Sequence, residues 1–242
     1  MRIAEHPLSY STFAVLRPRL RTAASTLVLG LLAPLAHATT VVDAPNDFIL
    51  SFTGAHSPDL DVLSTFATFD GSTFHIGATL NGNVGMLPSA LYVFGFDRGA
   101  GSVTSNFAAI GLPNVIFDSV ITMTGAGVTG GRDLVANAAI TLPAGAAQIS
   151  GASFTIDIPA GLLPSQGRAF DAYGFNLWPR DASVPAGNAQ IADFAPNDSN
   201  AIVSGVAAVP EPETYLLFAI GLLPVALGLR RERRRAPNGS HV

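Results

Sequence analysis

Glycine and proline interrupt the middle of the chain so often that a long helix is not expected there. The 242 residues include 24 glycines and 17 prolines, and between residues 39 and 209 they form turn signals at short intervals. No segment of this region keeps a helical period of apolar residues over three turns. Roughly ten short strands joined by such turns predict one antiparallel β-sandwich or jelly-roll-like domain of about 170 residues.

Alternating apolar and polar residues place individual strands. Residues 74–80 and 154–158 alternate as half-buried strands do, and Asp70-Gly71 predicts a hairpin turn before the first of them. Residues 91–96 are apolar on both faces, which is typical of a central strand covered on two sides. The segment 115–123 is predicted to be one strand with Val115, Phe117, Ile121 and Met123 on a common face. Further strands are expected at 48–53, 64–69, 134–142, 173–178, 189–194 and 201–206.

The formal net charge of −4 is unevenly distributed. Residues 1–38 sum to +3, residues 39–209 to −9 and residues 210–242 to +2. An acidic body argues against nucleic acid as a partner, because phosphate binding needs a basic face. All thirteen basic residues are arginines and cysteine is absent. This composition excludes a catalytic lysine, a disulfide framework, a thiolate metal site and a cysteine nucleophile.

Residues 1–38 are predicted to be a signal peptide. Three arginines precede the apolar run 23–35, and Ala36-His37-Ala38 follows it with the small–x–small pattern that signal peptidase accepts. The run is shorter than the ~20 residues that a stable spanning helix needs. Cleavage after Ala38 would start the mature chain near Thr39. The alternative is a buried N-terminal helix of the domain.

The C-terminal part has three consecutive elements. Pro210-Glu211-Pro212 is followed by the apolar run 215–229, and the two prolines favour an extended segment before a membrane helix. The basic cytoplasmic end, residues 230–235, contains Arg230, Arg231, Arg233, Arg234 and Arg235. Arginines at this end indicate that it stays in the cytoplasm, so the body is expected on the periplasmic side.

This tail, residues 209–235, resembles the PEP-CTERM sorting signal of Gram-negative bacteria in the order and spacing of its parts. The resemblance implies a substrate of exosortase, an inner-membrane protease thought to remove the tail near the Pro-Glu-Pro element. Proteins with such tails are expected at the cell surface or in the extracellular matrix of bacteria that make exopolysaccharide. Residues 236–242 extend beyond the usual end of such a tail. The alternative is an ordinary C-terminal membrane anchor.

Catalytic residues are not predicted. His56-Ser57-Pro58-Asp59 holds the residue types of a relay, but neighbours in a loop point apart. No Gly-x-Ser-x-Gly elbow occurs, and His75 is expected on the solvent face of its strand. Few histidines and no cysteine make zinc improbable. The region 39–208 contains no glutamate, so a glycosidase pair would consist of two aspartates.

Two oxygen-rich sets of residues lie far apart in the sequence. The first consists of Asp43, Asn46, Asp47, Asp59 and Asp61, and the second of Asp193, Asn197, Asp198 and Asn200. Calcium prefers six to eight such oxygens, but the twelve-residue calcium loop pattern is absent. Asp and Asn also cap turns with their side chains. No cofactor is predicted, and calcium is kept as the alternative.

Aromatic residues near the end of the domain offer a further hypothesis. Tyr173 and Phe175 share a strand face, Trp178 is out of phase with them, and together they could bind sugar rings or belong to the core. Arg98 and Arg180 are expected to pair with aspartates.

The sequence thus predicts an exported, non-enzymatic structural or adhesive protein linked to exopolysaccharide or biofilm. Its expected partners are signal peptidase, exosortase and, transiently, the inner membrane. The alternatives are a carbohydrate-binding module for an exopolysaccharide and a polysaccharide hydrolase.

Overall fold

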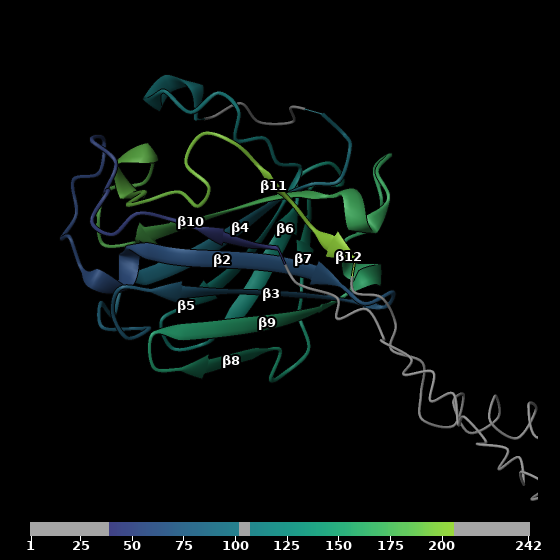
Figure 1. Cartoon of the computed structure of the whole chain (residues 1–242), viewed down its shortest axis with the longest axis horizontal. Helices are drawn as coiled ribbons and strands as arrows, with labels where there is room; N and C mark the ends of the chain where they lie inside the picture. The colour runs from purple at the N-terminus through teal and green to yellow at the C-terminus, as the bar shows by residue number, and fades with distance from the viewer. Residues whose placement is uncertain (1–38, 102–106, 206–242) are drawn as a thin grey trace, which may run out of the picture. The chain divides into compact units, whose positions relative to one another are not determined.

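The computed structural model describes residues 39–101 and 107–205, which form two β-sheets (Figure 1). These residues belong to one compact unit of the chain. The predicted signal peptide, residues 1–38, and the predicted sorting signal, residues 209–235, lie outside the described residues.

Each sheet has six strands. The first has the order β1 (Thr40–Val42), β2 (Val62–Phe69), β3 (Thr73–Leu80), β9 (Ser153–Pro159) and β8 (Ala147–Ser150), with β12 (Ser204–Gly205) also paired to β2. The second has the order β11 (Ala201–Ile202), β10 (Gly174–Asp181), β4 (Ala90–Asp97), β5 (Ser119–Thr124), β6 (Thr129–Asp133) and β7 (Ala138–Ile140). All pairs of strands are antiparallel except the short pair β2–β12. The predicted all-β class is therefore confirmed.

The helical segments of the described residues are short 3₁₀ turns. They are η1 (Pro58–Leu60), η2 (Ala108–Ile110), η3 (Ala160–Leu162), η4 (Phe170–Ala172) and η5 (Asn188–Gln190). Within residues 39–101 and 107–205, no helix has the length and apolar character that crossing a membrane requires.

The main core lies between the two sheets. Phe74 and Ile156 of the first sheet and Phe94 and Ile121 of the second belong to one cluster of buried apolar side chains. Because alternate residues of a strand point to opposite faces, each strand contributes every second side chain to this core. The two sheets therefore pack face to face as in a β-sandwich.

A second apolar cluster covers the outer face of the second sheet. Trp178 of β10 contacts Phe117 and Phe194 there, and Val93 of β4 belongs to the same cluster. Gly95 has no side chain, and a Cβ at this position would collide with the Trp178 ring. Strand β4 is thus buried on both faces, which confirms the prediction for residues 91–96.

The predicted hairpin turn joins β2 to β3. Gly71 has a φ of 101°, and the Oδ1 atom of Asp70 accepts hydrogen bonds from the backbone N–H groups of Ser72 (2.8 Å) and Thr73 (2.8 Å). Glycine and a side-chain acceptor are the two features that such a tight turn needs. The sequence signal for this turn is confirmed.

The prediction of one strand over residues 115–123 is wrong in its first half. Strand β5 begins at Ser119, and Asp118 and Ser119 both lie opposite Phe96, since the Asp118 N–H donates to the Phe96 carbonyl (2.8 Å). This extra residue is a β-bulge, which reverses the alternation of faces. Consequently Phe117 packs in the outer cluster while Ile121 packs in the main core.

Other predicted strands are also corrected. Residues 48–53 form no strand, because their backbone bonds to residues 189–192 are isolated ones such as Ile49 N–H to the Ala192 carbonyl (2.9 Å). Residues 189–194 likewise contain η5 and a single bridge. The segment 201–206 divides into β11 and β12, which belong to different sheets. Strands β1, β6 and β8 were not predicted.

Candidate metal centre

Three aspartates from two distant parts of the chain meet beside the first sheet, and a fourth, Asp61, borders the loop that carries two of them. Asp43 and Asp47 lie in the loop after β1, Asp61 directly precedes β2, and Asp193 follows η5. One carboxylate oxygen from each of Asp43, Asp47 and Asp193 lies within 4.8 Å of the other two. We call Asp43, Asp47, Asp61 and Asp193 the acidic cluster.

Backbone hydrogen bonds hold the acidic cluster together. Oδ2 of Asp193 accepts from the N–H of Val62 (2.8 Å), the first residue of β2, and Oδ1 accepts from the N–H of Phe194 (2.7 Å). Oδ2 of Asp61 accepts from the N–H of Asn46 (2.8 Å), which lies between Asp43 and Asp47. Asp61 therefore borders the loop that carries the first two carboxylates.

Several oxygens of the acidic cluster are buried without a hydrogen-bond donor. They are Oδ2 of Asp43, Oδ1 of Asp47 and Oδ1 of Asp61. Asp61 is 1% exposed, so bulk solvent does not reach its carboxylate. A buried acceptor without a partner costs free energy, and each one calls for an explanation.

No basic side chain of the described residues pairs with the acidic cluster. The arginines in this part of the chain are engaged elsewhere: Arg98 and Arg168 with other aspartates, Arg132 with Asn137, and Arg180 with Gln190. The carboxylates consequently repel one another without a positive charge from these residues to balance them.

This environment raises the pKa values of two carboxyl groups. Burial, and then the charges of Asp43 and Asp47, raise the pKa of Asp193 to about 8, although two backbone N–H groups act in the opposite direction. Burial and the charges of Asp47 and Asp61 raise the pKa of Asp43 to about 6. Both shifts have burial as their largest cause and neighbouring carboxylates as a further one, so the ionised form of these groups is disfavoured here unless a cation is present.

The atoms that the acidic cluster could offer to a metal ion are carboxylate oxygens. Asn197 adds an amide beside it, with Nδ2 3.5 Å from both Oδ1 of Asp43 and Oδ2 of Asp47. Turning this amide over would place its carbonyl oxygen toward the carboxylates. Oxygen ligands of this kind suit hard cations, whereas zinc prefers nitrogen and sulfur.

The structure joins part of each oxygen-rich set and separates the rest. Asp59 is buried elsewhere, where Oδ2 accepts from the N–H of Leu87 (2.9 Å) and the hydroxyl of Tyr92 (3.3 Å). Asp198 caps the backbone of Asn114, and Asn200 accepts from the N–H of Ile116. These three residues hold loops in place, as Asp and Asn in turns ordinarily do.

The histidines of the described residues do not form a relay. The His56 ring stacks on Phe48 with 4.3 Å between ring centroids, while the Ser57 hydroxyl donates to Asp59. His75 lies on the solvent side of β3, with Nδ1 2.8 Å from Oδ1 of Asp157 and Nε2 3.1 Å from Oδ2 of Asp70. Burial lowers the pKa of His75, but the two carboxylates outweigh it and leave that pKa raised.

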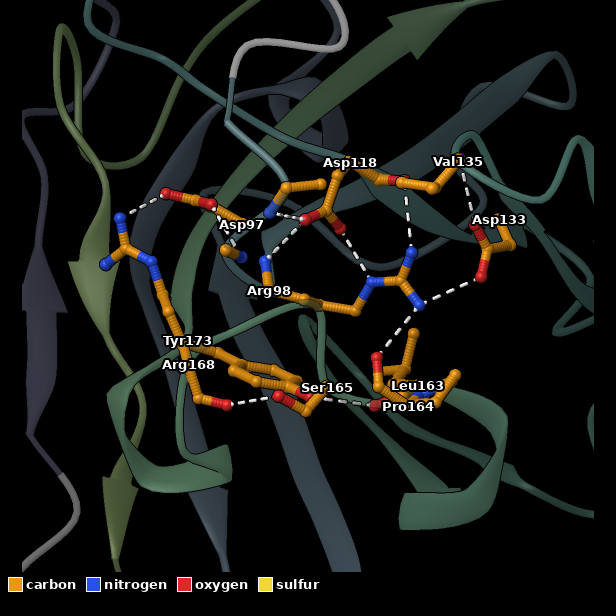
Figure 2. Close-up of polar contacts among 12 residues, drawn as sticks. Asp97, Arg98, Asp118, Asp133, Val135, Leu163, Pro164, Ser165, Arg168 and Tyr173 are labelled. Carbon is orange, nitrogen blue, oxygen red and sulfur yellow. Dashed lines mark hydrogen bonds and ion pairs between the residues drawn. The ribbon is translucent and has the colours of Figure 1, made fainter.

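Arg98 shows how the same domain buries charge with a partner (Figure 2). Its side chain is 0% exposed, and Nε donates to Oδ1 of Asp118 (2.6 Å) while Nη1 donates to Oδ2 of Asp133 (2.9 Å) and to the Pro164 carbonyl (3.2 Å). The hydrogen bond with Arg98 lowers the pKa of Asp133. Pairing of Arg98 with aspartates is thus confirmed, whereas Arg180 bonds to Gln190 and Gly187 instead.

The proposed aromatic platform is buried. Tyr173 and Phe175 are 0% exposed in the main core, and Trp178 is 2% exposed in the outer cluster. Their different faces agree with the sequence pattern. An open hollow of about 360 Å³ lies over the outer cluster, lined mainly by apolar side chains that include Val93 and Trp178. The Trp178 ring therefore contributes to packing rather than to a flat, exposed sugar platform.

Comparisons of the chain with protein-family models, with curated proteins and with solved structures found no match. Arguments about function therefore depend on the residues of this chain.

Proposed function

We propose that this is an exported, non-enzymatic protein with a structural or adhesive role at the cell surface or in the exopolysaccharide matrix. The observation that carries the proposal is the PEP-CTERM-like tail, with Pro210-Glu211-Pro212 before an apolar run and an arginine cluster. The body suits such a role because its two sheets pack as in a sandwich and its buried polar groups hold loops and strands together.

Processing at both ends would produce the mature protein. Signal peptidase would cut after Ala38, and the apolar run 215–229 would hold the precursor in the inner membrane with the arginines in the cytoplasm. Exosortase would then remove the tail near Pro210-Glu211-Pro212. The domain that contains the described residues, 39–101 and 107–205, would remain on the outer side.

The hydrolase alternative is less well supported. A glycosidase pair keeps its two carboxyl groups on either side of the scissile bond, about 5–5.5 Å apart in retaining enzymes and about 6.5–9.5 Å apart in inverting ones, where a water fits between them. In the acidic cluster one oxygen from each of Asp43, Asp47 and Asp193 lies within 4.8 Å of the other two. Such crowding suits the binding of one small cation better than a cleft for a polymer.

The sorting step can be tested by expressing the full chain in an exopolysaccharide-producing bacterium with and without its exosortase gene. We expect a longer, membrane-bound form in the deletion strain and a shorter, surface or matrix form in the parent strain, measured by fractionation and intact mass. Glu211→Ala is expected to cause accumulation of the longer form in the parent strain. Glu213→Ala, just outside the Pro-Glu-Pro element, is the matched control.

Equal mass and equal location in the two strains would contradict sorting by exosortase. An unprocessed membrane form in both strains would instead favour an ordinary C-terminal anchor.

A further inference from the structure

We propose that the acidic cluster, together with Asn197, is a calcium site that joins the loop after β1, the start of β2 and the segment before β11. This inference goes beyond the proposed function and does not depend on how the tail is processed. Its physiological setting, outside the cytoplasm, does depend on the proposed export.

The first argument is the missing positive charge. Asp61 and Asp193 are almost fully buried, Asp43 and Asp47 lie against them, and no arginine or histidine among the described residues is paired with any of the four. Carboxylates that share a buried site need a cation or a proton to offset their repulsion. Where this domain buries Asp118, it supplies Arg98.

The second argument is independent of charge and concerns hydrogen bonding. The Oδ1 atom of Asp61 is buried and has no donor, although Oδ2 of the same carboxylate is bound by Asn46 N–H and by Asn81 Nδ2, each at 2.8 Å. The bond to Asn46 places this carboxylate against the loop of Asp43 and Asp47, each of which also has a buried oxygen without a donor. Asp43 and Asp47 belong to the group of close carboxylates with Asp193, and Asp61 borders the loop that carries them. Buried acceptors without donors in and beside this group point to a ligand that accepts lone pairs, which a metal ion does.

The chemistry of the ligands favours calcium over other common ions. Calcium binds six to eight oxygens in flexible geometry at 2.3–2.6 Å, while magnesium demands a near-ideal octahedron and keeps several waters. Three clustered carboxylates, the amide of Asn197 and added water can satisfy calcium. The two backbone N–H groups that bind Asp193 leave its other lone pairs free for a metal.

A bound calcium ion would cross-link parts of the chain that are far apart in the sequence. Val62 and Asp193, which are hydrogen-bonded to each other, are 131 residues apart. Because the loop of Asp43 follows β1, the ion would also fix the edge of the first sheet near the start of the mature protein. A ligand that binds only the folded state stabilises it by mass action.

The test uses the full chain, purified in detergent, with calcium removed by a chelator and then titrated back as CaCl₂. At a calcium concentration about 100-fold above Kd we expect Tm to rise by about 5–10 °C. Isothermal titration calorimetry with CaCl₂ should show saturable binding. MgCl₂ at the same concentration should raise Tm much less.

Asp43→Asn and Asp47→Asn are the informative variants because both side chains are partly exposed, and folding should tolerate the change. Each is expected to raise the Kd for calcium at least about tenfold, because each removes one negatively charged ligand. Asp171→Asn, an exposed aspartate of η4 outside the acidic cluster, is the matched control and should keep the calcium response.

Two results would overturn the proposal. One is a folded wild-type chain that shows neither calcium binding nor a rise in Tm up to about 10 mM CaCl₂, above the range of weak extracellular sites. The other is an equal calcium response in the wild type, Asp43→Asn and Asp47→Asn. An equal response to magnesium would overturn the assignment to calcium. None of these outcomes bears on sorting by exosortase, which the fractionation experiment tests separately.

Discussion

Two groups of buried aspartates in this domain differ in whether a cationic side chain balances their charge. Asp118 and Asp133 surround the guanidinium of Arg98, and every dashed contact around that group in Figure 2 joins a donor to an acceptor. In the acidic cluster, Asp61 and Asp193 are as deeply buried, but no arginine or histidine of the described residues is paired with them. The first group is balanced by an arginine, whereas the second has no cationic side chain paired with it among the described residues.

This difference shows that burial alone does not distinguish a metal-binding carboxylate from a structural one. Asp118 is 0% exposed, yet its two oxygens accept from Arg98 and from the N–H of Ala100, so its role is structural. The oxygens of the acidic cluster that lack donors are the distinguishing feature. A buried ion pair contributes little net stability, whereas a buried charge without its partner is strongly destabilising.

The largest expected effect comes from removing the cation of the complete group. Arg98→Met keeps an unbranched side chain but leaves Asp118 and Asp133 without their partner, and should lower the free energy of unfolding by about 3–5 kcal/mol. Urea denaturation followed by circular dichroism measures this change. The exposed Arg132, which donates to Asn137, is the control, and Arg132→Met should cost less than about 0.5 kcal/mol. Similar losses in both variants would contradict the structural role of Arg98.

A smaller effect should have opposite signs in the two groups. With calcium chelated at pH 7, Asp43→Asn removes one of several repelling charges and should raise the free energy of unfolding by about 1 kcal/mol. Asp118→Asn instead places an amide against donors of Arg98 and should lower it by about 2 kcal/mol. Both variants can be compared by urea denaturation in the same buffer. A loss of stability in both would show that the acidic cluster is already compensated without a metal.

The smallest effect is expected at the exposed pair of carboxylates around His75. Because the pKa of His75 is raised in the folded state above its ordinary value of about 6.5, its stabilising contribution is fully present below pH 6.5. This contribution is lost as the pH rises through the higher folded-state pKa. His75→Gln should therefore reduce Tm more at pH 5.5 than at pH 8.5. Solvent screening keeps the effect small, since the side chain is 38% exposed.

A proton NMR titration measures the pKa of His75 directly. Asp157→Asn should lower that pKa, since it removes the carboxylate 2.8 Å from Nδ1. An unchanged titration curve in this variant would show that Asp157 does not interact with the ring in solution.

The sequence predicted those strands that have a clear pattern, either alternating or continuously apolar. Residues 74–80 and 154–158 alternate, residues 91–96 are apolar throughout, and all three correspond to β3, β9 and β4. Strand β6 was missed because Gly130 and Gly131 resemble a turn, although Gly131 pairs with Ile121 and a Cβ on it would collide with the Val120 carbonyl. The bulge at Asp118 was missed because both faces of this segment are covered by apolar clusters, so the change of face between Phe117 and Ile121 does not alter the apolar pattern.

All four residues of the acidic cluster belong to the oxygen-rich sets of the sequence, but to two separate sets. Each set also contained residues, Asp59 in the first and Asp198 in the second, that hold local structure instead. Residue type and spacing cannot distinguish a ligand from a turn cap, because both need a side-chain oxygen. The partners of Arg98 could not be chosen either, since thirteen aspartates of residues 39–209 were equivalent candidates.

The sequence by itself determined the all-β class and the main hairpin, because alternation and turn chemistry act between residues close in the chain. Only the tertiary structure decided which aspartates share a site and which are paired with arginine. Asp61 contacts a loop 15 residues before it, and Asp193 contacts Val62 across 131 residues, so both contacts form only when the chain folds. Charge compensation is a property of that assembled environment, and it separates a structural carboxylate from a proposed metal ligand.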